Sequence, residues 1–219
     1  MQDEGVISLV TRPTDWCSGM VVVCNKNGKV RICVDYTRLN RTVRREHHVI
    51  PAVDTNLAKR SNAKVFSKLD ACSGFWQIPL SVKSKLLTTF ITPKGRFCFN
   101  RLPFGISLAP EHVQRQMSNV LEGLDGIICH MDDILVYGGD QSTHDRRLVN
   151  VLHRLAAAGI KLNGDKCDFS QECVKFLGHV VDGDGIRADP EKINAVRSMP
   201  EPSNISQVRA ILGMANQLA

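Results

Sequence analysis

Two adjacent aspartates, Asp132 and Asp133, stand between the apolar runs 126–131 and 134–137. Phosphoryl transfer by two Mg²⁺ ions needs carboxylates that hold the metals about 3.5–4 Å apart. Like charges repel and desolvation penalises them, so an acidic pair in an apolar hairpin is costly unless cations compensate. A metal site would explain the pair, whereas a solvated turn, where Asp is common, is the simpler explanation for the pair taken alone.

A third aspartate, Asp70, follows the strand-like run 64–69, and Gly74 shortly afterwards permits a sharp change of direction. Three aspartates would suffice to hold two divalent ions. Nothing in the local sequence requires Asp70 to meet a pair 62 positions later, however, so by itself it is an ordinary acid at the end of a strand.

Strand-like and helical runs alternate along the chain and predict an α+β protein. Hairpins are expected over 20–34 with a turn at Asn27-Gly28, over 88–100, and over 126–137, where the turn carries both acids. A strand over 174–181 is followed by a turn at 182–185. Helices are expected over 109–121 with Pro110 in the first turn, over 142–158 with Gly159 as the stop, and after Pro202 with Ser203 as N-cap.

Composition narrows the class of protein. The 219 residues are 43% hydrophobic, and no apolar run approaches the length of a membrane span. The 28 Lys and Arg residues exceed the 22 acidic ones, and the net charge of +6 favours polyanionic partners. The N-terminal residues contain no hydrophobic stretch long enough for a signal peptide, and the eight cysteines form no Cys-x-x-Cys pair, so we expect an intracellular protein whose thiols are reduced and mostly packed in the core.

Several segments together resemble one family. His130-Met131-Asp132-Asp133 followed by 134–137 is similar to the Tyr-x-Asp-Asp box of reverse transcriptases. Segments 66–70 with 74–78, 86–90, 101–105 and 176–179 look like further blocks of that family in the same order. The amino-acid sequence of 129–136 and 100–105 most resembles that of gypsy-type (Metaviridae) LTR retrotransposons. The chain is therefore identified as a truncated reverse transcriptase domain of such a Pol polyprotein.

The resemblance implies a right-hand polymerase fold, in which the palm is an antiparallel sheet packed on helices. It assigns 1–44 and 80–103 to the fingers, 45–79 and 104–185 to the palm, and 186–219 to a partial thumb. The whole chain would form one reverse transcriptase domain.

The resemblance also implies a set of site residues. The catalytic and metal-binding groups are Asp70, Asp132 and Asp133 with the backbone carbonyl of Ala71, which would hold two Mg²⁺ ions, with Mn²⁺ able to substitute. The dNTP-binding residues are Lys26, Arg31, Ala71, Ser73, Gly74, Phe75 and Phe104, and the primer grip is Leu177 and Gly178. Phe75 stands at the steric gate that excludes a 2′-hydroxyl. Core packing is the alternative for Phe75, and a loose contact with solvent or template is the alternative for Lys26.

The implied activity is RNA-directed DNA polymerisation on an RNA or DNA template with primer and dNTPs. The implied partners also include a second copy of the chain or the remainder of a Pol polyprotein, but no membrane, and the implied location is a cytoplasmic virus-like particle with nuclear entry. His130 in place of Tyr and Cys24-Asn25 in place of Pro-Lys depart from the family pattern and hint at an ageing copy. A decayed or domesticated fragment that at most binds nucleic acid is therefore the alternative. An RNA-dependent RNA polymerase is disfavoured because it would lack a large gate such as Phe75.

Overall fold

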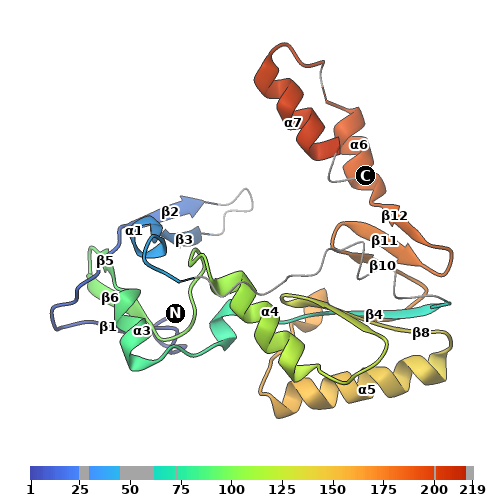
Figure 1. The fold of residues 1–219 in the computed structure, drawn as a ribbon, viewed down its shortest axis with the longest axis horizontal. Helices are drawn as coiled ribbons and strands as arrows, with labels where there is room; N and C mark the ends of the chain where they lie inside the picture. The colour runs from blue at the N-terminus through green and yellow to red at the C-terminus, as the bar shows by residue number, and fades with distance from the viewer. Residues whose placement is uncertain (25–29, 45–61, 73, 200, 216–219) are drawn as a thin grey trace.

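The computed structural model describes residues 1–24, 30–44, 62–72, 74–199 and 201–215, drawn as a ribbon in Figure 1. Short antiparallel sheets and the helices beside them give an α+β architecture. The first half of the chain contains β1 (Ile7–Leu9), β2 (Met20–Cys24), β3 (Val30–Val34), α1 (Thr37–Asn40), β4 (Val65–Asp70), the 3₁₀ helix η1 (Gly74–Gln77), α3 (Val82–Leu87), β5 (Phe90–Thr92) and β6 (Gly95–Phe99). The second half contains α4 (Ala109–Val120), β7 (Ile127–His130), β8 (Asp133–Gly138), α5 (Gln141–Ala157), the 3₁₀ helix η2 (Gly164–Lys166), β9 (Asp168–Gln171), β10 (Cys173–Phe176), β11 (His179–Asp182), β12 (Ile186–Ala188), α6 (Pro190–Arg197) and α7 (Ile205–Ala215).

The central sheet has the strand order β7-β8-β4-β9, and all of its pairs are antiparallel. Strand β8 is paired on both sides, and its residues Ile134, Leu135 and Val136 are fully buried. A continuous apolar run of this kind is expected for a strand that is covered on both faces.

Each face of the central sheet has a different cover, as Figure 1 shows with α5 on one side and β10, β11 and β12 on the other. Because strand side chains alternate between faces, Leu69 and Ile134 point to the helical side, whereas Phe66 and Leu135 point to the β10-β11-β12 sheet. The helical side is completed by Val113, Met117, Val151 and Leu155, and the other side by Val174, Phe176 and Val181.

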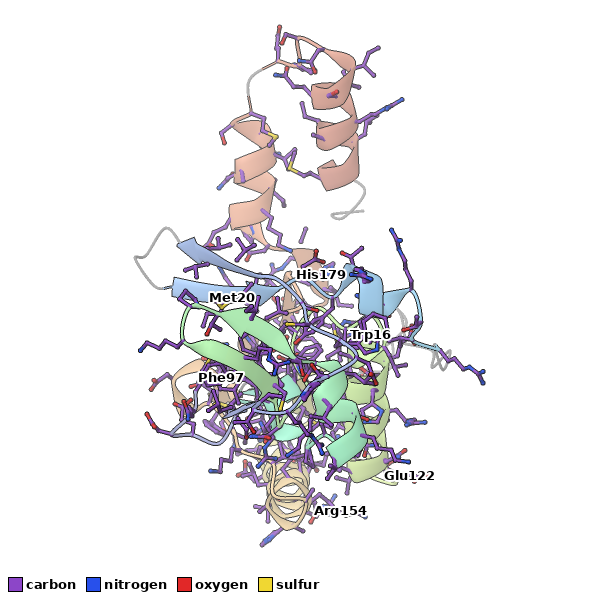
Figure 2. All side chains as sticks on the ribbon, turned by 90° about the vertical axis from the view of Figure 1, so that its left-hand side faces the viewer. Trp16, Met20, Phe97, Glu122, Arg154 and His179 are labelled. Carbon is purple, nitrogen blue, oxygen red and sulfur yellow. The ribbon has the colours of Figure 1, made fainter. Side chains whose placement is uncertain are left out.

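The N-terminal part contains the β1-β6-β5 sheet and the β2-β3 hairpin, which lie beside the central sheet in Figure 1. Its core gathers Phe90, Phe97 and Phe99, with the Phe90 and Phe99 ring centroids 5.2 Å apart. The helices α6 and α7 stand away from the rest of the molecule, as Figure 1 and Figure 2 show. Ile205 and Leu212 on α7 are exposed. No helix in the described residues combines the length and the apolar character needed to cross a membrane.

Most of the predicted elements are confirmed. Helix α4 has Pro110 in its first turn, and α5 ends where Gly159 takes a φ of +70°. The hairpin of β2 and β3 pairs Met20 with Val34, although its predicted Asn27-Gly28 turn lies outside the described residues. The sequence did not predict β1, β9, α1, α3, α6 or the two 3₁₀ helices.

Four predictions need correction. The turn between β7 and β8 holds Met131 and Asp132, because Asp133 already pairs with His130 as strand. The expected strand 174–181 is two strands, β10 and β11, joined by a turn at Leu177 and Gly178. The cap of α7 is Asn204, whose Oδ1 accepts the Gln207 N–H at 2.9 Å, whereas Ser203 N–H donates to the Gln207 side chain.

The fourth correction concerns the cysteines. Among those whose side chains are described, Cys98 is buried, Cys129 and Cys167 are half-buried, and Cys17, Cys33, Cys72 and Cys173 are exposed. Burial depends on the face that a position occupies in the sheet or loop, and residue type alone does not reveal that face. The predicted division into fingers, palm and thumb stays a prediction.

Candidate active site

The central sheet brings together acids that are far apart in the sequence. Strands β4 and β8 run antiparallel, and their register places Asp70 opposite Asp133. Beyond the last pair, the Ala71 N–H donates to the Asp132 carbonyl oxygen at 2.8 Å. Residues 70–71 and 132–133 therefore meet at one end of two neighbouring strands.

The alternation of side chains along each strand decides the face of the sheet on which Asp70 and Asp133 lie. By alternation, Asp133 shares its face with Leu135, and Asp70 shares its face with Phe66. That is the face covered farther along by β10, β11 and β12. The Asp70 side chain is 15% exposed, so its carboxylate lies at a partly open end of an otherwise covered face.

The turn that carries Asp132 is tightly constrained. Met131 takes a φ of +53°, a left-handed conformation that is unfavourable for a residue with a side chain. On the other side, a Cβ added to Gly74 at the start of η1 would lie 2.9 Å from the Asp132 Cβ. Glycine at position 74 thus lets the η1 backbone approach the acidic turn closely.

The negative charge at this end of the sheet is only partly compensated by neighbouring lysines. Burial raises the pKa of Asp133, the Lys68 ammonium opposes that shift, and the neighbouring Asp132 and Asp70 carboxylates raise the pKa further. Burial, followed by the charges of Asp132 and Asp133, raises the pKa of the Cys129 thiol to about 12. Both shifts indicate a poorly solvated region where added positive charge would be stabilising.

One ammonium group already supplies positive charge beside these acids. Lys166, at the end of η2, places its Nζ 3.3 Å from Asp70 Oδ1 and 3.2 Å from Asp70 Oδ2. The hydrogen bond and the charge of Asp70 raise the pKa of Lys166. A cation therefore rests against the carboxylate that terminates β4.

These residues fit a divalent metal by their chemistry. Carboxylate and carbonyl oxygens are the ligands that Mg²⁺ prefers, and the contact of the Lys166 ammonium with Asp70 shows that a cation is accommodated beside these acids. Across the described residues, no group of three or more His, Cys, Asp or Glu side chains is arranged to hold a metal ion as it stands. The carboxylates are neighbours rather than a closed coordination set.

The predicted nucleotide-binding residues are only partly described. Phe75, in η1, packs its ring against Phe104 with the centroids 4.8 Å apart, and Phe104 is 44% exposed. Arg31 pairs with Val23 through the backbone of β3, and its side chain lies outside the described residues. Lys26 and Ser73 also lie outside them.

The loop that presents Phe104 is held by a residue that the sequence analysis did not single out. The Asn40 side chain donates to the Gly105 carbonyl at 2.8 Å and accepts the Ser107 N–H at 2.9 Å. Gly105 takes a φ of +93°, which glycine adopts without strain. Asn40 thereby fixes the backbone that follows Phe104.

The predicted primer-grip residues are not on the central sheet. Leu177 and Gly178 form the turn between β10 and β11, with φ values of +50° and +84°. Two successive positive φ values are typical of a type I′ hairpin turn. Leu177 also packs against the cluster that contains Phe66 and Leu135, so this hairpin rests on the face that the aspartates share.

Two residues near the acids were missed in the sequence analysis. Lys166 is remote in sequence from Asp70, and a single lysine before a strand gives no signal of its own. Gln114 lies in the middle of α4 and is buried. In the sequence, the only signal was an amide side chain next to the apolar positions of a predicted helix. Buried amides require hydrogen-bond partners, which only the fold reveals.

Comparison with known proteins now decides the family. Residues 23–181 match the family described as reverse transcriptase (RNA-dependent DNA polymerase). The chain belongs to the reverse transcriptase family. It is 38% identical over 194 residues to the retrovirus-related Pol polyprotein from transposon opus of Drosophila melanogaster. The matched region covers 88% of this chain and 19% of that protein.

Other reverse transcriptase relatives point to the same kind of element. The Pol polyprotein from transposon gypsy of Drosophila melanogaster is 34% identical, over 87% of this chain and 19% of that protein. The Tf2-3 polyprotein of Schizosaccharomyces pombe is 33% identical, over 91% of this chain and 15% of its own length. The chain thus spans less than a fifth of these Pol polyproteins of LTR retrotransposons.

Solved structures confirm the polymerase fold. The foamy viral protease-reverse transcriptase dRH in complex with double-stranded DNA has a TM-score of 0.91 at 24% identity, over 98% of this chain and 38% of that chain. The foamy viral protease-reverse transcriptase in complex with an RNA/DNA hybrid has a TM-score of 0.87 at 23% identity, over 98% of this chain and 29% of that chain. The predicted α+β right-hand fold is therefore confirmed, and reverse transcriptases as a family use divalent metals.

Proposed function

We propose that this chain is the polymerase part of an LTR-retrotransposon Pol polyprotein and catalyses RNA-directed DNA synthesis. The observation that carries the proposal is the meeting of Asp70 and Asp133 in one strand register, with Asp132 joined to Ala71 by a backbone hydrogen bond. In a reverse transcriptase, three acids at one strand end suit transfer of a nucleotidyl group to the 3′-hydroxyl of a primer.

Asp70, Asp132, Asp133 and the Ala71 carbonyl would hold two Mg²⁺ ions, for which Mn²⁺ can substitute. When bound, the ions neutralise charge at the attacking and leaving oxygens of the displacement. The protein contributes rigid placement, because Asp70 and Asp133 are fixed by the strand register. The poorly solvated surroundings strengthen the interactions of the acids with a cation.

The sugar of the incoming dNTP would lie against the Phe75 ring, which Phe104 supports from the side. A large, braced ring leaves little room for a 2′-hydroxyl and selects deoxyribonucleotides. Gly74 permits close approach of the backbone to the triphosphate. Ala71, Ser73, Lys26 and Arg31 complete the proposed dNTP-binding set, in which the cationic side chains offset the negative charge that develops on the triphosphate.

The proposed partners are an RNA or DNA template with its primer. The two foamy viral structures named above contain double-stranded DNA and an RNA/DNA hybrid, and such duplexes suit a chain with a net charge of +6. Leu177 and Gly178 would contact the primer end as a grip. The remainder of a Pol polyprotein or a second copy of the chain would be a further partner, in a cytoplasmic virus-like particle with later nuclear entry.

Extension of oligo(dT) on poly(rA) tests the proposal. The wild-type chain should incorporate dTTP with Mg²⁺ or Mn²⁺, and a folded Asp132→Asn/Asp133→Asn variant should not, while both bind the duplex equally. Extension by both proteins would contradict the assignment of the acids. Duplex binding without extension by either protein would favour the second candidate, a decayed copy that only binds nucleic acid.

A further inference from the structure

The conformation of the turn between β7 and β8 decides where the Asp132 carboxylate lies. The pair His130–Asp133 closes the hairpin with only Met131 and Asp132 between the strands. Met131 adopts a φ of +53° in this turn, a left-handed conformation that is unfavourable for a residue with a Cβ. A turn that holds an unfavourable residue needs contacts that hold it in place.

One buried side chain of α4, Gln114, forms hydrogen bonds with the backbone of the turn. The Gln114 Oε1 accepts the Met131 N–H at 2.7 Å, and its Nε2 donates to the Cys129 carbonyl at 3.2 Å. Gln114 is 2% exposed, and its Nε2 is also 3.2 Å from Ser118 Oγ on the next helical turn. One amide therefore spans the backbone from the end of β7 to the strained residue of the turn.

The space beside Asp132 is partly open. A cavity of about 370 Å³ lies there, lined among others by Gly74, Val113, Met117 and Asp132. Beside this cavity, the turn is restrained by its hydrogen bonds with Gln114 and the Ala71 N–H and by the packing of Met131 against the cluster that contains Val113 and Met117.

We propose that Gln114 is a positioning residue for the metal-binding turn, which holds the Met131 backbone so that the Asp132 carboxylate faces the proposed ions. The inference rests on the proposed function, because it assigns Asp132 to metal binding. It predicts that loss of the amide weakens metal binding and slows the chemical step while substrate binding persists.

The test compares Gln114→Met, which keeps the length of the side chain and removes its hydrogen bonds, with Asn119→Met at an exposed position of α4. Mn²⁺ binding is followed by electron paramagnetic resonance, and single-nucleotide extension gives kcat and the KM for dTTP. We expect the Mn²⁺ dissociation constant of Gln114→Met to rise and its kcat to fall, each by about 10–100-fold, as for residues that support metal ligands. The KM for dTTP and the affinity for duplex should change less than about twofold, and Asn119→Met should match the wild type.

The melting temperature separates positioning from folding. Gln114→Met should melt about 3–6 °C lower because buried partners lose their hydrogen bonds, and all measurements are made where each protein is folded. If Gln114→Met does not fold, Gln114→Asn replaces it, since that amide is one methylene too short to reach Met131. A wild-type Mn²⁺ dissociation constant in the folded Gln114 variant would overturn the proposal.

The Mn²⁺ titration also distinguishes the two proposals. If the wild-type chain binds Mn²⁺ without extending a primer, the proposed polymerase activity fails, and the role of Gln114 is still decided by the titration of its variant. If the wild-type chain binds no Mn²⁺, both the metal site and the role of Gln114 are overturned.

Discussion

Strand β4 contributes to two polar sites that differ in how far their polar groups are paired within the protein. In its middle, Ser67 lies 2.9 Å from His144 Nε2 and accepts the Ser170 N–H at 2.9 Å, while His144 Nδ1 lies 2.9 Å from Asp145 Oδ1. Ser67 and His144 are fully buried. The buried Ser67 hydroxyl and both ring nitrogens of His144 therefore have partners within the protein, and the network joins β4 to α5 and β9.

At the end of the same strand, Asp70 meets Asp133 and Asp132 with no comparable closure. The Lys166 ammonium that contacts Asp70 is on a side chain that is 63% exposed, and the pKa of Asp133 is raised by burial and by the other acids. A network whose buried polar groups are all paired contributes to stability. A cluster of like charges lowers stability, but it can bind cations.

The largest expected effect is at the open end. Asp132→Asn/Asp133→Asn should lower the rate of primer extension at least about a thousandfold, since it removes ligands worth several kcal/mol in the transition state. Its melting temperature without metal should equal or exceed that of the wild type because charge repulsion is relieved. Extension kinetics and thermal unfolding in EDTA check both statements, and a large loss of stability would contradict the contrast between the two sites.

The closed network should respond in the opposite way. Ser67→Ala leaves the His144 ring and the Ser170 N–H without their partner, which should cost about 1–3 kcal/mol of unfolding free energy. Urea unfolding measures this loss. The extension rate per folded molecule should stay within about twofold of the wild type, and a rate defect without a stability defect would show that the network also positions the acids.

A smaller effect concerns pH. Because the folded pKa of Asp133 lies above its ordinary value, the folded state binds the proton more tightly, and unfolding free energy falls as pH rises from the ordinary carboxyl range to the folded pKa. Asp133→Asn removes this decrease. Melting temperatures in EDTA at a series of pH values should therefore show that the variant gains stability relative to the wild type as pH rises. If the difference in melting temperature did not change with pH, the raised pKa of Asp133 would be contradicted.

The smallest expected effect is at Lys166. Its contact with Asp70 is largely solvent-exposed, so Lys166→Met should change the unfolding free energy by at most about 1 kcal/mol. Removing an ammonium that competes for Asp70 should tighten Mn²⁺ binding in the absence of substrates. An isothermal titration compares the two proteins, and weaker binding by the variant would show that Lys166 does not compete with the ion.

The sequence predicted those parts of the fold that local patterns encode. The spacing of Val113 and Met117, the first-turn Pro110 and the stop at Gly159 were sufficient for α4 and α5. The turn at Leu177 and Gly178 was missed because the apolar run continues through it. The cap of α7 lies one residue later than predicted, because Asn204 takes this role in place of Ser203.

The site was predictable only through family resemblance. No local pattern joins Asp70 to Asp133, because their meeting depends on the antiparallel register of strands separated in the chain. The contributions of Gln114, Lys166 and Asn40 depend on contacts across elements, with separations of 17, 96 and 65 positions. Such contacts follow from tertiary packing and leave no periodic signal in a single sequence.

The central claim is that the acids at the end of β4 and β8 bind divalent metal. Electron paramagnetic resonance of Mn²⁺ with the wild-type chain, Asp132→Asn/Asp133→Asn and Ser67→Ala tests it directly at a temperature where all three are folded. The account predicts equal Mn²⁺ binding by the wild type and Ser67→Ala and none at this site in the double variant. Binding by the double variant with the wild-type dissociation constant would contradict it.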